Sequence, residues 1–406
     1  MGLVVMKFGG SSVADADKIK NVARRVMETR DAGNKVVVVV SAPGDTTDDL
    51  ITWAEKITAD PDDREMDMLL STGEQMSIAL LAMAIKDKGY KAISLTGAQV
   101  GILTDKVHNM AKIVHIPTKK IRKELRKGNI VVVAGFQGIT EDEDITTLGR
   151  GGSDLTAVAL ASVLKADVCE IFTDVLGVYT TDPRIVHEAR KLDIISYDEM
   201  LEMAGLGAQV MQARSIEVAK KFNIDIHVRS TFSHEKGTII TREVTKMEDV
   251  VVRGIASDKN QAKISIIDLP DKPGVAASMF TELAAKGINV DMIIQSSAAD
   301  GRNDISFTVS HKDLPKTLEV MEKIKRELGA TEVIHDRNVA KISIVGVGMR
   351  SHVGIASKMF SALARAGINI EMISTSEIKI SCVIKNVNVE KAVKVIHKAF
   401  NLEKKK

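Results

Sequence analysis

A glycine-rich turn with a lysine beside it is the first feature of this sequence that could do chemistry. Lys7 and Phe8 end a run of apolar residues and are followed directly by Gly9, Gly10 and Ser11. Glycines leave backbone N–H groups exposed, and a glycine turn at the start of a helix binds anions such as phosphate. The lysine precedes the glycines, so the turn differs from the Gly-x4-Gly-Lys-Ser/Thr nucleotide loop. An ordinary strand-to-helix turn, capped by a serine, explains these residues equally well when they are taken alone.

A second glycine-rich turn repeats this arrangement later in the chain. Arg150 precedes Gly151 and Gly152, and after Ser153 an Ala-rich apolar helix is expected to begin at Asp154. On its own, this turn is also explained as the lead-in to a buried, capped helix. Two such turns, each with a cation alongside and each following a strand of the same sheet, favour a site for a polyphosphate.

Further polar residues follow another predicted strand or open a predicted helix. Ser41 and Thr47 lie directly after the strand at 36–40, and Glu74 lies where a helix ending near residue 88 is expected to open. An acidic residue in the first turn of a helix is favoured by the helix dipole, and for Glu74 alone this structural explanation is the better one. The carboxylate could also hold the ammonium group of a substrate.

The segment after the predicted strand at 168–172 carries another polar cluster. It contains Thr173, Asp174, Tyr179, Asp182 and Arg184. The tyrosine ring could lie against a nucleotide base, with the acid and the arginine nearby. A turn with a half-buried tyrosine is the safer interpretation of these residues taken alone.

Patterns typical of several other catalytic chemistries are missing from the sequence. The nine histidines form no HExxH or other close metal-ligand pattern, no serine occupies a nucleophile elbow, and neither cysteine has a catalytic signature around it. The sequence therefore disfavours covalent and zinc-dependent mechanisms.

The elements that must position these residues alternate between strands and helices over roughly the first 250 residues. Continuous Val- and Ile-rich runs predict buried strands of a parallel sheet covered on both faces, at 3–6, 36–40, 92–95, 130–133 and 168–172. Apolar residues at helical spacing predict helices at 19–27 and 76–88 between them. The predicted fold class is α/β, with a doubly wound, mostly parallel sheet that binds ligands at the carboxyl ends of its strands.

The last third of the chain contains an internal repeat. DKPGVAASMF at 271–280 and GINVDMI at 287–293 recur as SHVGIASKMF at 351–360 and GINIEMI at 367–373, a constant offset of 80 residues. Each copy has a strand, a helix opened by glycine, two more strands and a second helix, which predicts a ferredoxin-like βαββαβ unit. We expect one domain at 1–245 and two smaller ones at 250–335 and 336–406, with a charged linker at 241–249.

Composition narrows the class of protein. The chain has 406 residues, 45% of them hydrophobic and 27% charged, with 56 basic against 54 acidic side chains and only 3% aromatic residues. Balanced charge and few aromatic residues argue against nucleic-acid binding. Two cysteines indicate a reducing compartment. The longest apolar run, at 78–85, is far shorter than the roughly 20 residues of a membrane helix. We therefore expect a cytoplasmic protein that binds neither nucleic acid nor membrane.

Taken together, these motifs resemble those of the aspartate kinase family. The resemblance extends over residues 3–400 and rests on the order and spacing of VMKFGG (5–10), GDTT (44–47), REMDMLLSTGE (64–74), LTGAQ (95–99), AGFQG (134–138), TLGRGGSD (147–154) and DPR (182–184). It implies an amino-acid-kinase fold for 1–245 and a regulatory ACT domain for each repeat. It also implies that ATP phosphorylates the side-chain carboxylate of L-aspartate to 4-phospho-L-aspartate, the first step toward lysine, threonine and methionine.

The resemblance implies roles in phosphoryl transfer for the residues of the two turns. Lys7 would stabilise charge on the transferring group, and Asp154 would organise Lys7 and the phosphate site. Mg²⁺ is expected on the ATP phosphates, held largely by phosphate and water. The implied nucleotide-binding residues are Lys7, Phe8, Gly9, Gly10, Ser11, Thr173, Asp174, Tyr179, Thr180, Asp182, Arg184 and Gln209.

For the amino-acid substrate, the resemblance implies that Glu74 pairs with the ammonium group and Arg150 with a carboxylate, as a bidentate fork. The aspartate carboxylate is already ionised at pH 7, so the attacking group needs no general base. The implied substrate-binding residues are Ser41, Thr47, Glu74, Arg150, Gly151, Gly152, Ser153 and Asp154.

Some positions depart from the family pattern. Gln209 stands where the family usually has a nucleotide-contacting lysine, which predicts a raised KM for ATP more than a lowered kcat. Ser11 replaces a common threonine, and Leu176 stands where aspartate or proline is common. In the second repeat, Val353 replaces the proline found at Pro273, so the two repeats need not bind an effector equally.

The ACT resemblance implies feedback inhibition by lysine, threonine or both, which requires two states of unequal effector affinity. Pairing of ACT repeats commonly joins two chains, so we expect at least a homodimer. Met247 leaves open a separate regulatory subunit. The implied effector-binding residues are Asp271, Pro273, Gly274, Val275, Ala276, Asn289, Asp291 and Gln295 in the first repeat and Val353, Gly354, Asn369, Ile370, Ser376 and Glu377 in the second.

Two alternative functions remain open at this point. One is another carboxylate kinase of the same fold, acting on glutamate or N-acetylglutamate, although an ammonium-binding Glu74 is of no use to an acetylated amine. The other is a non-catalytic amino-acid sensor, although the retained Lys7 and Asp154 argue against it.

Overall fold

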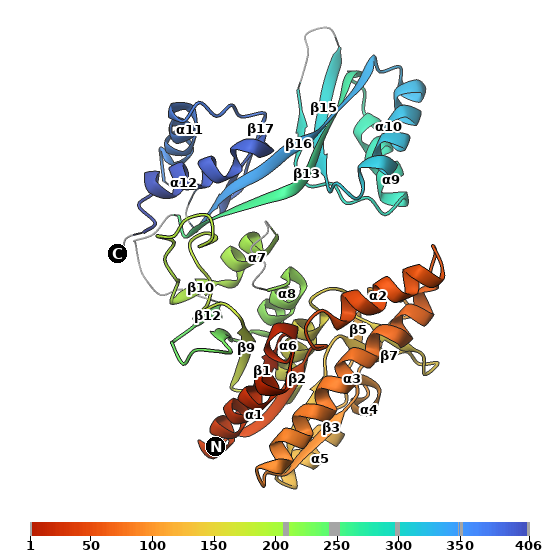
Figure 1. The fold of residues 1–406 in the computed structure, drawn as a ribbon. Coiled ribbons are helices and arrows are strands. Elements are labelled where there is room, and N and C mark those ends of the chain that lie inside the picture. Colours follow the sequence, from red (N-terminus) through yellow and green to blue (C-terminus); the bar gives the residue numbers. More distant parts are fainter. Residues whose placement is uncertain are drawn as a thin grey trace. The chain divides into compact units, whose positions relative to one another are not determined.

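The chain folds into two compact units (Figure 1). The structure, a computed structural model, describes residues 2–205, 211–242, 252–296, 301–347, 349 and 352–403. The first unit holds the described residues up to Val178, Lys191–Gly205 and those from 211 to 242, and the second holds Tyr179–Arg190 and those from 252 onward. The expected domain boundaries stay a prediction. Most of the expected linker, with Met247, lies outside the described residues.

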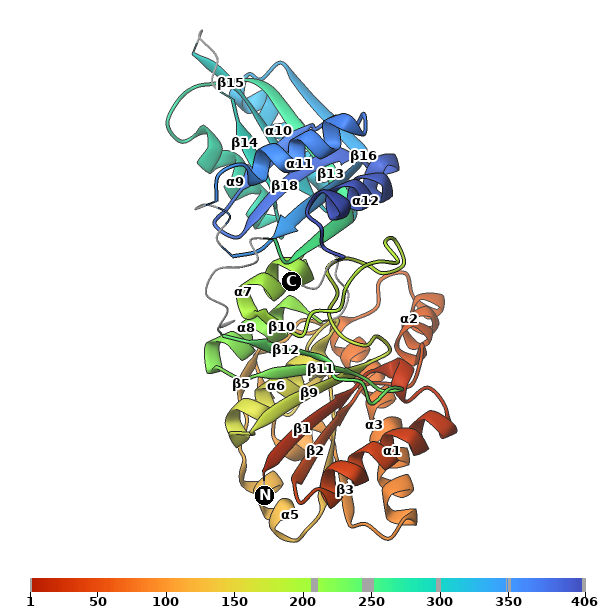
Figure 2. The same cartoon turned by 90° about the vertical axis from the view of Figure 1, so that its left-hand side faces the viewer.

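An eight-stranded, mostly parallel sheet forms the centre of the first unit (Figure 2). Its order is β10-β12-β11-β9-β1-β2-β6-β3, and only the β11–β12 pair is antiparallel. All five strands predicted from the sequence are present in it. The strands are β1 (Leu3–Phe8), β2 (Lys35–Val40), β3 (Ala92–Leu95), β6 (Ile130–Ala134), β9 (Val168–Thr173), β10 (Ile194–Ser196), β11 (Ile226–Ser230) and β12 (Thr238–Thr241).

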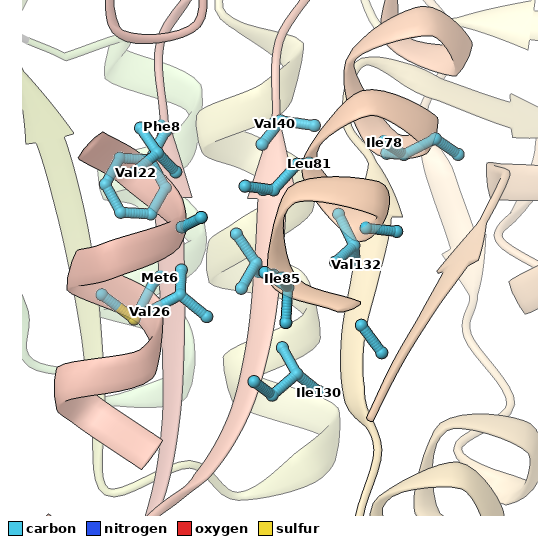
Figure 3. Packing of buried hydrophobic residues seen from close by; sticks show 14 of the residues in the cluster. Met6, Phe8, Val22, Val26, Val40, Ile78, Leu81, Ile85, Ile130 and Val132 are labelled. Carbon is cyan, nitrogen blue, oxygen red and sulfur yellow. The ribbon is translucent and has the colours of Figure 1, made fainter. Parts of the chain in front are cut away.

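Helices cover both faces of this sheet, which is why its Val and Ile runs are continuous. On one face, α1 (Ala16–Asp31) and α3 (Asp63–Asp87) bury a core that includes Phe8, Leu81 and Ile85 (Figure 3). On the other face, α6 (Gly152–Leu164) packs against β1, β2 and β9. Side chains alternate along β1, so Lys7 points to the face that α6 covers.

The rest of the first unit consists of short elements. Four short strands form a second sheet in the order β5-β4-β7-β8. These strands are β4 (Leu103–Thr104), β5 (Ile113–His115), β7 (Gln137–Ile139) and β8 (Ile145–Thr147). The remaining helices are η1 (Gly10–Ser12), α2 (Thr46–Ile57), α4 (Gly97–Val100), α5 (Lys119–Arg126), α7 (Tyr197–Gly205) and α8 (Ala213–Phe222).

Two helix starts differ from the sequence-based expectation. The helix α3 begins at Asp63 and is capped by Asp62, so Glu74 lies in its middle and the first-turn interpretation of Glu74 is wrong. The helix α1 is capped by Asp15, whose carboxylate accepts the N–H of Lys18, and no serine of the glycine turn caps it. Both helices therefore begin at aspartates, which are strong N-caps.

The helix α3 is long and apolar enough, judged by length and composition alone, to cross a membrane, with a mean hydropathy of 1.4 over 18 residues. One face of the helix packs in the core of the first unit. Leu81 and Ile85 are fully buried in the core with the sheet, and Asp67 and Glu74 are buried ionisable residues bonded to loops of the same unit.

A six-stranded sheet in the order β14-β15-β13-β16-β18-β17 forms the second unit. Two apolar cores, one for each repeat, lie between the sheet and the helices. The strands are β13 (Gly254–Pro270), β14 (Ile293–Gln295), β15 (Arg302–Val309), β16 (Glu332–Val345), β17 (Met372–Thr375) and β18 (Lys379–Lys385). The helices are α9 (Val275–Ala285), α10 (Leu314–Leu328), α11 (Ile355–Arg365), η2 (Asn386–Asn388) and α12 (Val389–Ala399).

The two repeats are interlocked rather than consecutive. Among the described residues, no strand follows α12. The missing strand of the second repeat comes from the start of β13, where Gly254 pairs with Val345 and Asp258 with Lys341. The long strands β13 and β16 therefore each serve both repeats. This exchange joins residues far apart in sequence, which is why periodicity alone did not reveal it.

Candidate active site

The candidate site lies where the carboxyl ends of β1, β2 and β6 meet the start of α6, as expected for an open parallel sheet. Lys7, the next-to-last residue of β1, places Nζ 2.6 Å from Oδ1 of Asp154 in the first turn of α6. The two side chains are only 13% and 9% exposed, so this is a mostly buried ion pair. The structure therefore brings together the two residues expected to be catalytic.

The first glycine turn is held tightly against the loop that follows β2. The N–H of Gly44 donates to the carbonyl of Gly10 over 3.0 Å, and a Cβ on Gly10 would lie 2.8 Å from the carbonyl oxygen of Ala42. Ser12 is buried and shares a 2.6 Å hydrogen bond with Thr231, whereas Ser11 is exposed. Only glycine allows the two loops to approach this closely, so the turn is preformed rather than loose.

Glu74 reaches the same loop from the middle of α3. Gly73 lets the helix approach, because a Cβ there would lie 2.7 Å from Cβ of Ala42. The N–H of Ala42 donates to Oε1 of Glu74 over 3.0 Å, while Oε2 is buried and has no hydrogen-bond partner among the described residues. Burial raises the pKa of Glu74 to about 8. A buried carboxylate with one unused oxygen is suited to receive a cationic group.

The second glycine turn opens α6 in a left-handed conformation. Gly149 and Gly151 have φ values of 78° and 72°, and Gly151 is the N-cap. Gly152 and Ser153 are buried against neighbouring loops, whereas Arg150 is exposed. The turn therefore holds the start of α6 rigidly and leaves the guanidinium of Arg150 accessible at the same place.

The other residues expected to touch the nucleotide or the substrate in this unit have mixed environments. The ring of Phe8 is fully buried and stacks on Phe172 with centroids 4.6 Å apart, so only its backbone can reach a ligand. Thr173 donates to the exposed carboxylate of Asp174 over 3.0 Å at the end of β9. Ser41 and Thr47 are half-buried in the loop after β2 and in the first turn of α2.

The segment Tyr179–Arg190 is part of the second unit. Val186 packs in the core of the second repeat. The hydroxyl of Thr180 accepts the N–H of Arg190 over 3.0 Å and lies 3.0 Å from Nε2 of His397, and Thr180 is fully buried. Its backbone N–H and C=O are bonded as well. The polar groups of Thr180 are thus bonded inside the second unit, and its role toward a nucleotide stays a prediction.

Asp182 and Arg184, from the same segment, pair with each other. The guanidinium donates to both carboxylate oxygens, with Nη2 2.8 Å from Oδ2, and this hydrogen bonding lowers the pKa of Asp182. Tyr179 is half-buried. Gln209 lies outside the described residues. The roles of these four residues toward a nucleotide stay predictions.

The residues expected to bind an effector occupy equivalent places in the two repeats. Gly274 and Gly354 open α9 and α11 in the left-handed conformation, with φ values of 96° and 93°, so the expected glycine-started helices are confirmed. Ser376 accepts backbone N–H groups in a turn before β18. The exposed members are Asp271, Pro273, Asn289, Asp291, Gln295, Val353, Asn369, Ser376 and Glu377, while Val275, Ala276 and Ile370 are half-buried.

Asp291 differs from the simple expectation because it already has a cationic partner. Its carboxylate forms an ion pair with Lys341 on β16. At the equivalent place in the other repeat, Glu371 pairs with Lys263 on β13 over 3.2 Å. Each repeat therefore receives a lysine from the central strand of the other, and an effector would have to compete with that lysine for Asp291.

Sequence reasoning missed Arg214, which supports the second glycine turn. Its guanidinium donates to the carbonyl of Leu148 over 2.9 Å and to the carbonyl of Ala111 over 2.6 Å. An arginine in the first turn of α8 gives no local signal of this role, because both acceptors are backbone atoms distant in sequence.

Comparison with known proteins shows which families this sequence is related to. Residues 2–230 match the model of the amino acid kinase family, and residues 264–328 and 342–400 match two models of the ACT domain. An aspartokinase of Mycolicibacterium smegmatis is 51% identical over 407 residues, covering 99% of this chain and 97% of that protein. This chain belongs to the aspartokinase family.

Solved aspartokinase structures agree with this assignment. Escherichia coli aspartokinase III in complex with aspartate and ADP matches with a TM-score of 0.83 and 26% identity, over 98% of this chain and 99% of that one. The same enzyme in complex with lysine and aspartate matches with a TM-score of 0.75 at the same identity and coverage. The α/β fold class, the ACT repeats, the family and the kinase class expected from the sequence are confirmed.

Proposed function

We propose that this aspartokinase-family chain transfers the γ-phosphoryl group of ATP to the side-chain carboxylate of L-aspartate, giving 4-phospho-L-aspartate and ADP. The observation that carries this proposal is the unused, buried Oε2 of Glu74 in the same loop cluster as the Lys7–Asp154 ion pair. One group suits an ammonium and the other suits a transferring phosphoryl group. That combination fits a free amino acid better than an N-acetylated one.

The reaction needs positioning and charge neutralisation rather than a general base. One oxygen of the ionised aspartate side chain attacks the γ-phosphorus, a new P–O bond forms, and the bond to the bridging β–γ oxygen breaks, leaving ADP. Lys7 neutralises negative charge that collects on the transferring group and on the leaving oxygen. Asp154 holds the lysine in place through the 2.6 Å ion pair. Backbone N–H groups of the Gly9–Gly10 turn donate to the phosphates.

Mg²⁺ fits the phosphate side of this site. Asp154 at the start of α6 and Asp174 after β9 offer carboxylate oxygens, which are the donors that Mg²⁺ prefers. These residues would hold the ion together with phosphate oxygens and water. The described residues contain no cluster of three or more His, Cys, Asp or Glu that could hold a metal by itself. The bound ion neutralises phosphate charge and orients the γ-phosphoryl group.

The substrate lies between α3 and the start of α6 in this proposal. Glu74 accepts the ammonium group through Oε2, and Arg150 binds a carboxylate as a fork. Ser41, Thr47 and Ser153 supply neutral donors, and Gly151 and Gly152 form the turn at the start of α6 that follows Arg150.

The second unit would regulate this activity by binding an amino acid, lysine, threonine or both, at the glycine starts of α9 and α11. The related Escherichia coli enzyme has been solved in complex with lysine. The exposed edge strands β14 and β17 suit pairing with a second chain, so we propose that the protein forms at least a homodimer. A separate regulatory subunit is an open alternative. A biosynthetic kinase of this kind acts in the cytoplasm.

A hydroxamate assay tests the proposed function. Purified protein is incubated with ATP, Mg²⁺ and hydroxylamine and with aspartate, glutamate or N-acetylglutamate, each with and without lysine and threonine. We expect acyl phosphate with aspartate and inhibition by an effector. Turnover with glutamate instead would establish a different carboxylate kinase. Effector binding without turnover on any of the three acids would establish a sensor.

A further inference from the structure

A buried aspartate on α3 organises a polar network that phosphoryl transfer itself does not use. Asp67 is fully buried, and its carboxylate accepts three hydrogen bonds from two different segments. Thr147 at the end of β8 donates its hydroxyl over 2.5 Å, and the N–H of Asn109 donates over 3.1 Å. Nδ1 of His108 lies 2.7 Å away. The carboxylate is fully satisfied, so it is not waiting for a ligand.

The network ends at the turn that carries Arg150. Thr147 precedes that turn by two residues, and its carbonyl accepts the N–H of Ala111 over 2.9 Å. A Cβ on Gly149 would lie 3.1 Å from the carbonyl oxygen of Asn109, so the 108–111 segment packs directly on the turn. The strand end that precedes the turn and the 108–111 segment that packs on it are thus bonded to the same carboxylate. Asp67 therefore fixes where the turn begins.

The same helix carries Glu74, seven residues after Asp67. Seven residues are nearly two helical turns, so the two carboxylates lie on one face of α3 and about 10 Å apart along its axis. Glu74 faces the loop after β2, and Asp67 holds the turn before α6. One rigid helix therefore fixes the position of the ammonium side of the amino-acid site relative to its carboxylate side.

We propose that Asp67, acting through Thr147 and the 108–111 segment, is a positioning and specificity-determining residue. It sets the distance between the ammonium-binding Glu74 and the carboxylate-binding Arg150, and so selects the length of the amino diacid. This inference rests on the proposed function, because it uses the substrate roles of Glu74 and Arg150. A diacid one methylene longer than aspartate would fit only if the turn moved away from α3.

The test compares two nearly isosteric changes at one buried position. Thr147→Val removes the hydroxyl donor and keeps the shape of the side chain, and Thr147→Ser keeps the donor. Asp67→Asn is a second variant that removes the charge. For each, KM and kcat are measured for aspartate, for glutamate and for ATP, together with the thermal midpoint.

We expect Thr147→Val and Asp67→Asn to raise KM for aspartate by about tenfold, the factor that corresponds to one hydrogen bond to a charged group. The preference for aspartate over glutamate in kcat/KM should fall, and KM for ATP should stay within twofold of wild type. Thr147→Ser should restore the wild-type values. Glu124→Gln is the matched control, since Glu124 is a buried carboxylate of the same unit that bonds Lys127 and Asn129.

Three results would overturn this role. The first is a lower thermal midpoint with an unchanged KM for aspartate, which is what a merely structural residue would give. The second is an equal rise in KM for ATP, and the third is a Thr147→Ser variant as impaired as Thr147→Val. The wild-type assay is separate from all three. If the wild-type chain is inactive on aspartate, both the proposed function and this role of Asp67 are wrong. If the wild-type chain is active and the variants keep its KM for aspartate, only the role of Asp67 is wrong.

Discussion

Glu74 places one carboxylate oxygen against the N–H of Ala42 and leaves the other buried without a partner among the described residues. An ionised carboxylate in this position is costly unless a cation lies beside it. We predict that Glu74→Gln raises KM for aspartate by roughly a hundredfold, because truncating a buried charge pair costs several kcal/mol. The value of KM for ATP should change little. A variant with a wild-type KM for aspartate would show that the ammonium binds elsewhere.

The raised pKa of Glu74 makes substrate binding depend on pH. Burial raises this pKa from 4.5 to about 8, so the free enzyme holds a proton there at neutral pH. An ammonium partner favours the ionised form, and we predict that aspartate binding near pH 7 releases close to one proton. Titration calorimetry in buffers of different ionisation enthalpy measures this release. It should vanish above about pH 9 and be absent in Glu74→Gln, and equal release from that variant would contradict the assignment.

The raised pKa of Glu74 also determines how the stability of the ligand-free protein changes with pH. The folded state keeps the Glu74 proton more tightly than the unfolded chain does, so the stability of the ligand-free protein falls as pH rises from 4.5 to about 8. Above that range this group contributes no further change. In Glu74→Gln this part of the pH dependence should be missing.

In this account, the Lys7–Asp154 ion pair acts in the phosphoryl-transfer step. We predict that Lys7→Met lowers kcat roughly a thousandfold, the scale found when a preorganised donor to the developing charge is removed. The KM for aspartate should change much less, since aspartate binds to Glu74 and Arg150. Steady-state kinetics on both substrates checks this, with Lys18→Met as the control, at a lysine of α1 whose side chain is 40% exposed. A small effect on kcat with a large one on KM for aspartate would reverse the assignment.

At the residue scale, sequence reasoning predicted that the two glycine-rich motifs lie where a strand ends or a helix starts. The two glycine turns were expected together because parallel strands deliver their carboxyl ends to one edge. The family resemblance paired Lys7 with Asp154, and the structure shows this ion pair. The motif that contains Thr180 says nothing about burial, and the structure shows its hydroxyl bonded inside the second unit. Asp67 gave no signal, since its partners come from two distant segments.

The helix α3 is the element on which the amino-acid side of the site depends. It touches the loop after β2 at Gly73, where a Cβ would lie 2.7 Å from Cβ of Ala42. We predict that Gly73→Ala pushes α3 away from this loop, breaks the Ala42–Glu74 hydrogen bond and raises KM for aspartate by about tenfold. Ser77→Ala, one turn along the same buried face, is the matched control and should be neutral. Equal kinetics in the two variants would show that the helix contact is unimportant.

The strands and helices of the first unit follow from local sequence, because each strand is a continuous β-branched run buried between helix layers. The start of α3 was missed by more than ten residues because its first turns are polar and exposed on one side, with the apolar stretch only later. The exchange of strands between the repeats could not be read from periodicity. It depends on pairing between β13 and β16, whose partners are about 65 to 90 residues apart, and local patterns do not encode such pairing.

At the scale of the whole molecule, a segment that leaves the kinase sheet after Val178 becomes part of the regulatory unit and returns at Lys191. Val186 is 6% exposed in the core of the second repeat. We predict that Val186→Ala destabilises the second unit by about 2 kcal/mol and leaves the first unit's unfolding transition unchanged. Differential scanning calorimetry checks this, with the 65% exposed Val114→Ala as control. A shift in the first transition alone would show that the segment stabilises the kinase unit instead.

A structure of the chain with ADP and L-aspartate bound tests the central claim most directly, because that claim concerns two specific contacts. We predict the ammonium nitrogen about 2.8 Å from Oε2 of Glu74, with Lys7 Nζ directed at the β-phosphate and the side-chain carboxylate of aspartate. An ammonium group bound away from Glu74, or Lys7 turned away from both ligands, would contradict it.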